Sequence, residues 1–415
     1  MNRRNLLELF SGLGCLGGLS FSNFVYANPT SKRFLFVFCD GGWDPTMVFA
    51  PLLNNRYVYY DHNDTQSNIG DISFVDSPNR PMVRNFFETW ASKSLIINGI
   101  DIESIAHDRA KRILMTGLSF GDDDWPAIIG SHSPDTYTAP HLVLSGPNYS
   151  TLYSNAILRM GKNGELSRLL DGNENTSVQP YHGTEDIVSD YLQTRARKAQ
   201  TPSVFSAKFQ ADYLRSHEQL RELQAQSLEL HTNASNDYGQ TCNETFMAQA
   251  SIALDFFAKG LTRTAIVEDN GYCNMRWDSH GDIFEQNLHY DLLFQGLDML
   301  MQELETRVDI HGVPLIDNTI VVVCSELGRH PQLNEMGGKH HWPVTSMMIL
   351  NGTQGNRCIG GFDEQVLGKN IDLRTGELSN NGEKIHTGNI GATILALADI
   401  DPSEFTVHAP IEGIL

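Results

Sequence analysis

Short apolar runs separated by polar segments recur along the chain from residue 33 onward. The first run, residues 33–39, reads Arg-Phe-Leu-Phe-Val-Phe-Cys and is apolar at consecutive rather than alternating positions. This pattern is typical of a central strand in a parallel sheet, because helices then cover both of its faces. Five later runs have a similar character: residues 94–98, 141–144, 264–267, 319–324 and 346–350.

Helical patterns lie between several of these runs. The clearest covers residues 284–307, where large apolar side chains recur at helical spacing. They are Leu288, Leu292, Leu293, Leu297, Leu300, Met301 and Leu304. Strands that alternate with helices predict an α/β fold with a doubly wound, mostly parallel sheet. A chain of 415 residues is long enough to bury a large core, and we expect residues 28–415 to form one domain.

The segment from about 150 to 250 has a different composition. It holds a polar stretch at 171–180, a long charged helical pattern near 203–230 and a loop-like stretch at 233–243. We interpret this segment as a mostly helical insertion in the α/β domain. The sequence leaves open whether it caps the mouth of a site or packs at the periphery.

The N-terminus has the features of an export signal. Arg3 and Arg4 precede a weakly apolar stretch that runs to Val25, in the manner of a twin-arginine signal, and Val-Tyr-Ala at 25–27 fits a cleavage site. We therefore predict a signal peptide at 1–27, the twin-arginine export machinery as a partner, and a periplasmic or secreted protein. The alternatives are an ordinary secretory signal, an uncleaved anchor or lipid attachment at Cys15. No later segment has about 18 uninterrupted apolar residues, so we expect no stable membrane span after cleavage.

Charge and cysteine content narrow the partners further. The chain carries 30 Lys and Arg against 50 Asp and Glu, a formal net charge of −20. Such a surface repels nucleic-acid phosphates, so we expect no nucleic-acid partner. An anionic ester or an anionic envelope polymer stays compatible with this charge if a metal ion supplies local positive charge.

No Cys-x-x-Cys pair occurs, and Cys242 and Cys273 lie in polar sequence where they could form a disulfide in an oxidising compartment.

Acids and histidines follow the ends of several predicted strands. In an open parallel sheet, ligands bind outside the carboxyl ends of the strands. The residues there include Asp40, Asp44, Asp278, His280, Glu326, Arg329, His340 and His341. Taken singly, an Asp after a strand is often a helix cap and a loop His pair is often solvated. Taken together, the carboxylates and imidazoles among these residues are the ligand types that zinc, manganese or calcium require. We therefore predict a divalent-metal site.

The order of four short motifs resembles a known group. It runs Asp-Gly-Gly, Asp-x-His, Ser-Glu-x-Gly-Arg and then Gly-Gly-x-x-His-Trp-Pro, from about residue 34 to residue 401. This order resembles the twin-arginine-exported, sulfatase-like family described as a domain of unknown function. The resemblance implies an alkaline phosphatase-like fold that places one or two metal ions at the strand ends. It is weakest between residues 150 and 250.

The resemblance also implies roles for individual residues. One metal site would hold Asp278, His280 and His341, or its neighbour His340. A second, built on Asp40 and Glu326, is short of a ligand because Leu327 stands where relatives have His. Arg329 would bind an anion with two hydrogen bonds, or alternatively pair with Glu326 or another carboxylate. The residues expected to support the site are Asp44, Lys111 and Trp277.

The nucleophile is the point at which the chain departs from sulfatases. Residues 107–117 resemble the sulfatase segment that ends in Met-Thr-Gly, with His107 at the nucleophile's position. His107 could attack phosphorus, act as a general base or bind metal. The same departure could mean that the site does not catalyse. Thr46 is a fallback nucleophile.

Two functions therefore remain open from the sequence. The first is an exported metal-dependent hydrolase of phosphate or sulfate esters, with His107 and Arg329 as its catalytic residues. The second is a non-catalytic binding or assembly protein of the cell envelope that keeps the sulfatase-like fold. The missing hydroxyl or thiol nucleophile and Leu327 favour the second, and the convergence of the four motifs favours the first.

Overall fold

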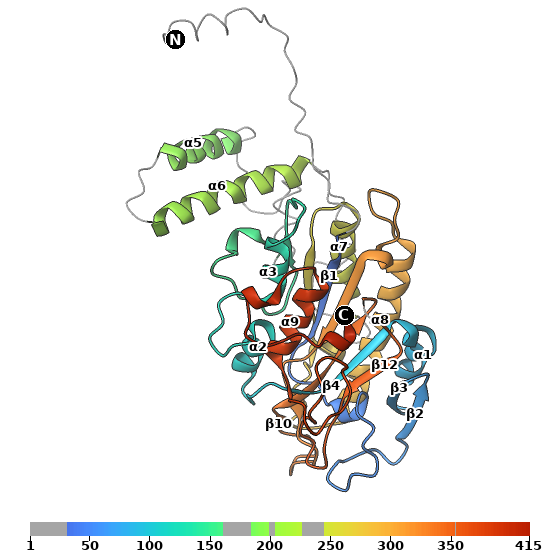
Figure 1. The fold of residues 1–415 in the computed structure, drawn as a ribbon. Coiled ribbons are helices and arrows are strands. Elements are labelled where there is room, and N and C mark those ends of the chain that lie inside the picture. The colour runs from blue at the N-terminus through green and yellow to red at the C-terminus, as the bar shows by residue number, and fades with distance from the viewer. Residues whose placement is uncertain (1–30, 161–183, 199–203, 226–244, 353) are drawn as a thin grey trace, which may run out of the picture.

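The computed structural model describes residues 31–160, 184–198, 204–225 and 245–415 except residue 353. Within these ranges the chain forms a mixed α/β structure around one large sheet (Figure 1). The predicted signal peptide at 1–27 and parts of the predicted insertion lie outside the described residues. Cys273 is disulfide-bonded, and its predicted partner Cys242 also lies outside them.

Nine of the described strands form the central sheet, in the order β12-β4-β11-β8-β1-β7-β5-β6 with β13 paired to β4. Their bounds are β1 (Arg33–Cys39), β4 (Ser94–Asp101), β5 (His141–Val143), β6 (Ile157–Arg159), β7 (Thr264–Asp269), β8 (Thr319–Cys324), β11 (Val344–Leu350), β12 (Arg357–Gly360) and β13 (Ile385–His386). All six predicted runs are strands of this sheet. Neighbours pair in parallel except β11, which is antiparallel to both β4 and β8. The predicted α/β class and mostly parallel sheet are confirmed.

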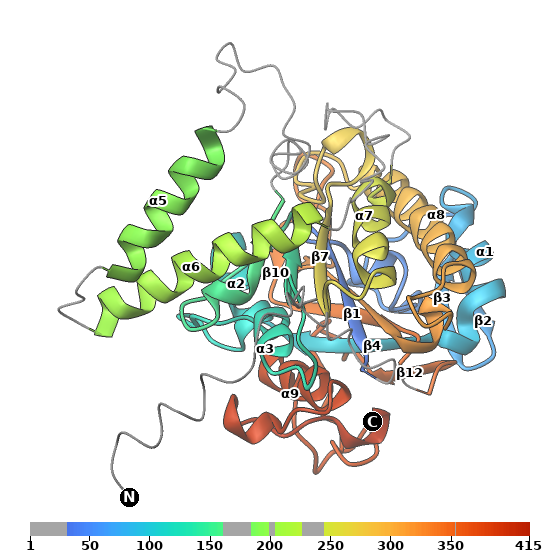
Figure 2. The ribbon, with the colours of Figure 1, turned by 90° about the horizontal axis from the view of Figure 1, so that it is seen from above.

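Helices pack on both faces of the sheet (Figures 1 and 2). One face carries α1 (Pro81–Trp90), α7 (Met247–Ala258) and α8 (Glu285–Thr306), and the other carries α2 (His107–Thr116), α3 (Trp125–Ser131) and α9 (Thr387–Leu397).

The central strand β1 shows why both faces are covered. Its Leu35, Val37 and Cys39 belong to the first core, whereas Phe34, Phe36 and Phe38 belong to the second. Successive side chains of a strand point to opposite faces, so an uninterrupted apolar run requires apolar partners on each side.

Smaller elements lie outside the central sheet. The strands β2 (Thr65–Ile69) and β3 (Ile72–Asp76) form a hairpin, and β9 (Gly328–Arg329) pairs with β10 (His341–Trp342). The helices α5 (Thr184–Lys198) and α6 (Val204–Ala225) belong to the predicted insertion and lie to one side of the sheet in both views. Among the described residues, none of the helices has the length and apolar character needed to cross a bilayer.

Buried His141 in β5 should make folding stability sensitive to acid. Its side chain is fully buried, and this burial lowers the pKa of His141 from 6.5 to about 3. Between these values the unfolded chain binds a proton that the folded chain does not, so stability falls as the pH drops below 6.5. From pH 7 to pH 5 the His141→Gln variant should lose about 2 kcal/mol less unfolding free energy than the wild type.

Urea unfolding at the two pH values measures this difference. His62→Gln, at an exposed histidine, is the matched control and should keep the pH dependence of the wild type. An equal loss of stability in wild type and His141→Gln would contradict the assignment of this acid sensitivity to His141.

Candidate metal centre

The site lies at the carboxyl ends of the three central strands. β1 pairs in parallel with β7 on one side and with β8 on the other. The segments that follow these strands therefore leave the sheet at the same edge. They deliver Asp40 after β1, the loop that contains Asp278 after β7, and Glu326 after β8.

Glycines allow the loops to approach one another closely. Gly41 has φ +123°, and a Cβ built there would lie 2.6 Å from the backbone nitrogen of Asp278. The backbone N–H of Trp277 donates to the carbonyl of Asp40 at 2.9 Å, which holds this loop on the end of β1. A Cβ on Gly338 would overlap the backbone of His280. Glycine in the Asp-Gly-Gly and Gly-Gly motifs is thus required for backbone packing.

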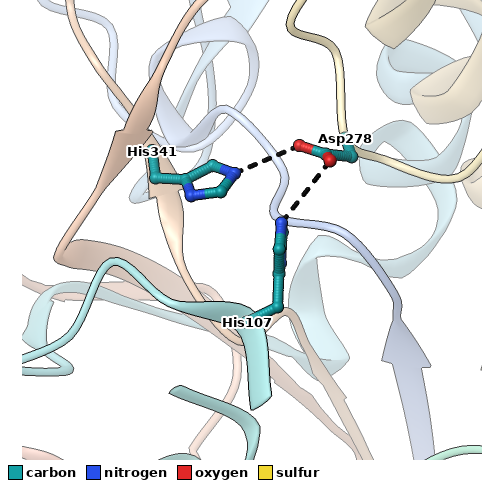
Figure 3. Close-up of side chains that lie close together, drawn as sticks. All are labelled: His107, Asp278 and His341. Atoms are coloured by element: carbon teal, nitrogen blue, oxygen red, sulfur yellow. Dashed lines mark hydrogen bonds and ion pairs between the residues drawn. The ribbon is translucent and has the colours of Figure 1, made fainter. Parts of the chain in front are cut away.

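Three side chains from distant segments converge at this edge (Figure 3). His107 begins α2, Asp278 lies in the loop after β7, and His341 lies in β10. One ligand atom from each lies within 4.8 Å of the others. His341 Nε2 is 3.2 Å from Asp278 Oδ1, and His107 Nε2 is 3.5 Å from Asp278 Oδ2.

His280 adjoins the same group. Its Nε2 lies 3.2 Å from Asp278 Oδ1 and 2.8 Å from His341 Nε2. The structure therefore brings together Asp278, His280 and His341, the three residues that the sequence assigned to one site. It adds His107, for which the sequence left metal binding as one of three roles. We call Asp278, His107, His280 and His341 the metal centre.

Hydrogen bonds to the far side of two imidazoles direct their Nε2 atoms into the metal centre. His341 Nδ1 donates to the carbonyl of Ile105 at 2.6 Å, and His107 Nδ1 lies 2.8 Å from Glu326 Oε1. An oxygen acceptor at Nδ1 is the usual partner of a histidine that binds metal through Nε2. His107 Nε2 is buried, and it lies 3.5 Å from Asp278 Oδ2. An imidazole nitrogen and a carboxylate oxygen that face each other in this way are both possible ligands of one cation.

The pKa shifts favour a cation at Asp278 and His280 and oppose it at His107. Hydrogen bonds to Asp278 and Glu326 raise the pKa of His107 to about 9, so a cation has to displace a proton from this ring. Burial raises the pKa of Asp278, but hydrogen bonds from His107, His341 and Arg329 outweigh burial and hold the pKa well below its usual range. Burial lowers the pKa of His280. An ionised carboxylate and a neutral imidazole are the forms that bind metal.

Glu326 lies behind the metal centre rather than in it, which differs from its predicted role as a ligand. Its side chain is fully buried and accepts hydrogen bonds from the backbone N–H of Gly41 at 3.0 Å and from His107 Nδ1. Ser325 Oγ lies 3.2 Å from its second oxygen. Because these groups occupy the carboxylate, Glu326 orients His107, the arrangement by which a second carboxylate supports a metal-binding histidine.

Asp40 also differs from its predicted role. Lys111 and Arg276 form ion pairs with its two separate oxygens. Protein groups thus pair with both carboxylates of the predicted second metal site, Asp40 and Glu326. Lys111 was expected to border the site, whereas Arg276 was missed. Its place two residues before Asp278 in the Asp-x-His loop is the one signal that could have found it.

Arg329 differs from the predicted anion-binding residue. Its side chain is fully buried, and the guanidinium donates to Asp278 Oδ1 at 2.7 Å. Its remaining hydrogen bonds go to the carbonyls of Gly41, Gly42, Trp277 and Lys339. Without an exposed face it cannot reach a ligand in solution. The alternative role, an ion pair with a carboxylate, is the one observed, with Asp278 as the partner.

His340 is exposed, and its ring centroid lies 5.6 Å from that of His280. It precedes β10 and lies outside the group of side chains around Asp278. Of the pair left open by the sequence, His341 is the one that faces Asp278.

Two of the expected supporting residues lie beneath the metal centre. Asp44 is fully buried, accepts from Lys339 Nζ at 2.6 Å, and accepts from the Thr46 hydroxyl at 2.7 Å. The Thr46 hydroxyl is buried with it and is not placed as a nucleophile. Trp277 is buried, donates from Nε1 to Asp269 Oδ1 at 2.9 Å, and packs edge-on against Tyr290.

Comparisons with known proteins give one family and several distant structures. Residues 31–410 match the model of the family described as "Protein of unknown function (DUF1501)". No curated protein matches the chain.

Solved structures resemble the chain only weakly. The chain is similar to "Ps i-CgsB in complex with k-i-k-neocarrahexaose" at 8% identity and TM-score 0.40, covering 91% of this chain and 75% of that one. It is similar to the PsFucS1 sulfatase from Pseudoalteromonas sp. at 10% identity and TM-score 0.33, covering 89% and 68%. It is similar to the phosphonate monoester hydrolase of Agrobacterium radiobacter at 10% identity and TM-score 0.32, covering 89% and 74%. Scores this low do not assign a function, so the metal centre has to be judged on its own geometry.

Proposed function

The chain belongs to the DUF1501 family, and we propose that it is a metal-dependent hydrolase of phosphate or sulfate esters. The observation that carries the proposal is the convergence of His107, Asp278 and His341, whose ligand atoms all lie within 4.8 Å of one another. The three side chains come from distant segments of the chain, and together they offer the nitrogen and oxygen ligands that a transition metal binds.

The donor set favours particular metals. Three imidazoles and one carboxylate make up the metal centre, whereas calcium and magnesium prefer oxygen ligands. Zinc and manganese accept such mixed nitrogen and oxygen ligands. We therefore propose zinc or manganese rather than calcium.

The residues around the metal centre have separable tasks in this proposal. A bound cation supplies polarisation of the ester and lowers the pKa of a bound water. Glu326 holds the His107 ring in one orientation through Nδ1. Arg329 holds the Asp278 carboxylate and the loop carbonyls in place. The backbone of Ile105 holds the His341 ring.

The proposed setting is outside the cytoplasm. The arginine pair and the cleavage pattern at 25–27 support export by the twin-arginine machinery and a periplasmic or secreted location. The proposed substrates are small anionic esters or esters carried by an anionic envelope polymer. Fractionation of cells that express the full chain tests the location.

Metal analysis combined with turnover tests the proposed function. We expect about one zinc or manganese ion per chain by elemental analysis, and hydrolysis of at least one aryl phosphate, aryl sulfate or phosphodiester. A chelator should abolish hydrolysis, and the same metal should restore it. Protein that binds no metal would overturn the proposal. Metal that raises the melting temperature without any turnover would favour the alternative, a binding or assembly protein.

Replacing Glu326 by Gln should weaken metal binding about tenfold. This is near the smaller of the losses in affinity that follow when a group that orients a metal-binding histidine is replaced. The amide still accepts a hydrogen bond from His107 Nδ1, but it lacks the negative charge that makes the imidazole a better donor to metal. Competition with a chelating dye measures the affinity. Glu335→Gln, at an exposed position, is the matched control and should bind metal as the wild type does. Equal affinity in Glu326→Gln and wild type would show that Glu326 does not support the metal centre.

A further inference from the structure

A second cluster of charges lies beside the metal centre, in the wall of a cavity of about 410 Å³. Its centre is Asp40, whose side chain is 7% exposed. Lys111 Nζ pairs with one oxygen of Asp40, and the Arg276 guanidinium pairs with the other. Two positive groups share one carboxylate, so this trio keeps a net positive charge. All three residues line the cavity, together with Tyr149, Glu268 and Asn270.

Both cations keep hydrogen-bond donors for a ligand. An ammonium has three N–H groups and a guanidinium has five, and Asp40 can accept from only some of them. The Arg276 side chain is 50% exposed and that of Lys111 is 17% exposed. Asp40 therefore holds the two cations in place without covering them. This differs from Arg329, which is fully buried.

Two of the three segments that build the metal centre also supply the two cations of this cluster. His107 and Lys111 are four residues apart on α2 and so share one face of the helix. Arg276 precedes Asp278 by two residues in the loop after β7. Each cation therefore lies within four residues of a metal-centre residue, although the metal-centre residues themselves do not line the cavity.

The backbone at Arg276 is strained. Its φ is +62°, and Cys273 and Asn274 in the same loop also have positive φ values. A side chain with a Cβ rarely adopts this conformation, and such positions collect at functional sites. Gly or Asn would fit the backbone at residue 276 better than Arg does.

From these observations we propose that Lys111 and Arg276, held by Asp40, bind the anionic oxygens of the substrate beside the metal centre. The inference rests on the proposed function and deepens it. A guanidinium and an ammonium around one point match the oxygens of a phosphate or sulfate group. Glu268 lines the same cavity, is 6% exposed, and offsets the single positive charge that Lys111, Arg276 and Asp40 leave.

Inorganic phosphate and sulfate are the probes for the test. Their binding is measured by calorimetry on the full chain, metal-free and metal-loaded, for wild type, Arg276→Asn and Lys111→Met. Asn tolerates the positive φ of residue 276, so this variant removes the charge without adding backbone strain. Arg109→Gln, at an exposed position on α2, is the matched control. We expect the dissociation constant to rise about tenfold or more in each test variant, and to stay unchanged in Arg109→Gln.

Metal content and melting temperature are measured on the same samples, which separates this inference from the proposed function. Undiminished phosphate and sulfate binding by Arg276→Asn would overturn the inference even if metal content and turnover are intact. Conversely, weakened anion binding by the variants of a protein that holds no metal would support the inference and overturn the hydrolase. Arg276 is half exposed, so its variant provides the test if Lys111→Met fails to fold.

Discussion

The Asp278→Asn variant will bind metal at least about 100-fold more weakly than the wild type, and its ester hydrolysis will fall in proportion. This loss is larger than that expected for a residue such as Glu326, which orients a metal-binding histidine. Asp278 is the only carboxylate of the metal centre, and its two oxygens face His107, His280 and His341. Asn preserves the shape and can still accept from Arg329, but it has no negative charge to offset that of a divalent cation. Elemental analysis and chelator competition measure the loss.

The control for this prediction is in the same loop. Asp282 is exposed, and its Oδ1 accepts from the backbone N–H of Phe284. Asp282→Asn should keep full metal content and activity. If Asp278→Asn retained one tightly bound metal ion per chain, the ion would have to lie elsewhere, and the assignment of the metal centre would be wrong.

Lys339→Met is expected to lower the unfolding free energy by about 3–5 kcal/mol, the usual cost of removing one partner of a buried ion pair. Lys339 Nζ lies 2.6 Å from Asp44 Oδ2, and both side chains are fully buried. The pair joins the loop that precedes His341 to the segment after β1. Without Lys339, the Asp44 carboxylate stays buried and keeps only its hydrogen bonds with Thr46. Urea unfolding monitored by tryptophan fluorescence measures the loss.

A second substitution tests the cause of this loss. In the double variant Asp44→Asn/Lys339→Met neither of these two positions carries a buried charge, so much of the lost stability should return. Lys369→Met, at an exposed lysine, is the matched control and should unfold at the same urea concentration as the wild type. A midpoint for Lys339→Met equal to that of Lys369→Met would show that the buried pair contributes little to stability.

The hydrophobic pattern alone determined the class of the fold. Runs such as residues 33–39 are apolar at consecutive positions, and only a strand covered on both faces can bury all of these side chains. The orientation of β11 was not predicted. Between Cys324 and Val344 the chain forms β9 and β10 and no helix. A parallel strand needs a crossover, so β11 enters the sheet antiparallel.

The residues that follow the strands were also predictable, because parallel strands bring their carboxyl ends to one edge. This rule predicted that acids and histidines gather at one edge, and the family resemblance selected Asp278, His280 and His341 among them. It could not predict which of the side chains at this edge contact one another. Glu326 and Asp40 both lie there, yet one orients His107 and the other holds Lys111 and Arg276.

Only the tertiary structure decided which carboxylate lies among the histidines of the proposed metal centre and which carboxylates pair with other protein groups. The end of a strand fixes the position of the following residue only to within about a few ångströms. Whether its side chain can bind a metal ion or a protein group depends on differences in distance of less than about one ångström. Arg329 shows this most clearly, since it follows a strand as the sequence indicated but turns inward onto Asp278 and four carbonyls. Apart from Lys339, these partners lie more than 50 residues away in the sequence, and no local pattern encodes how their loops pack.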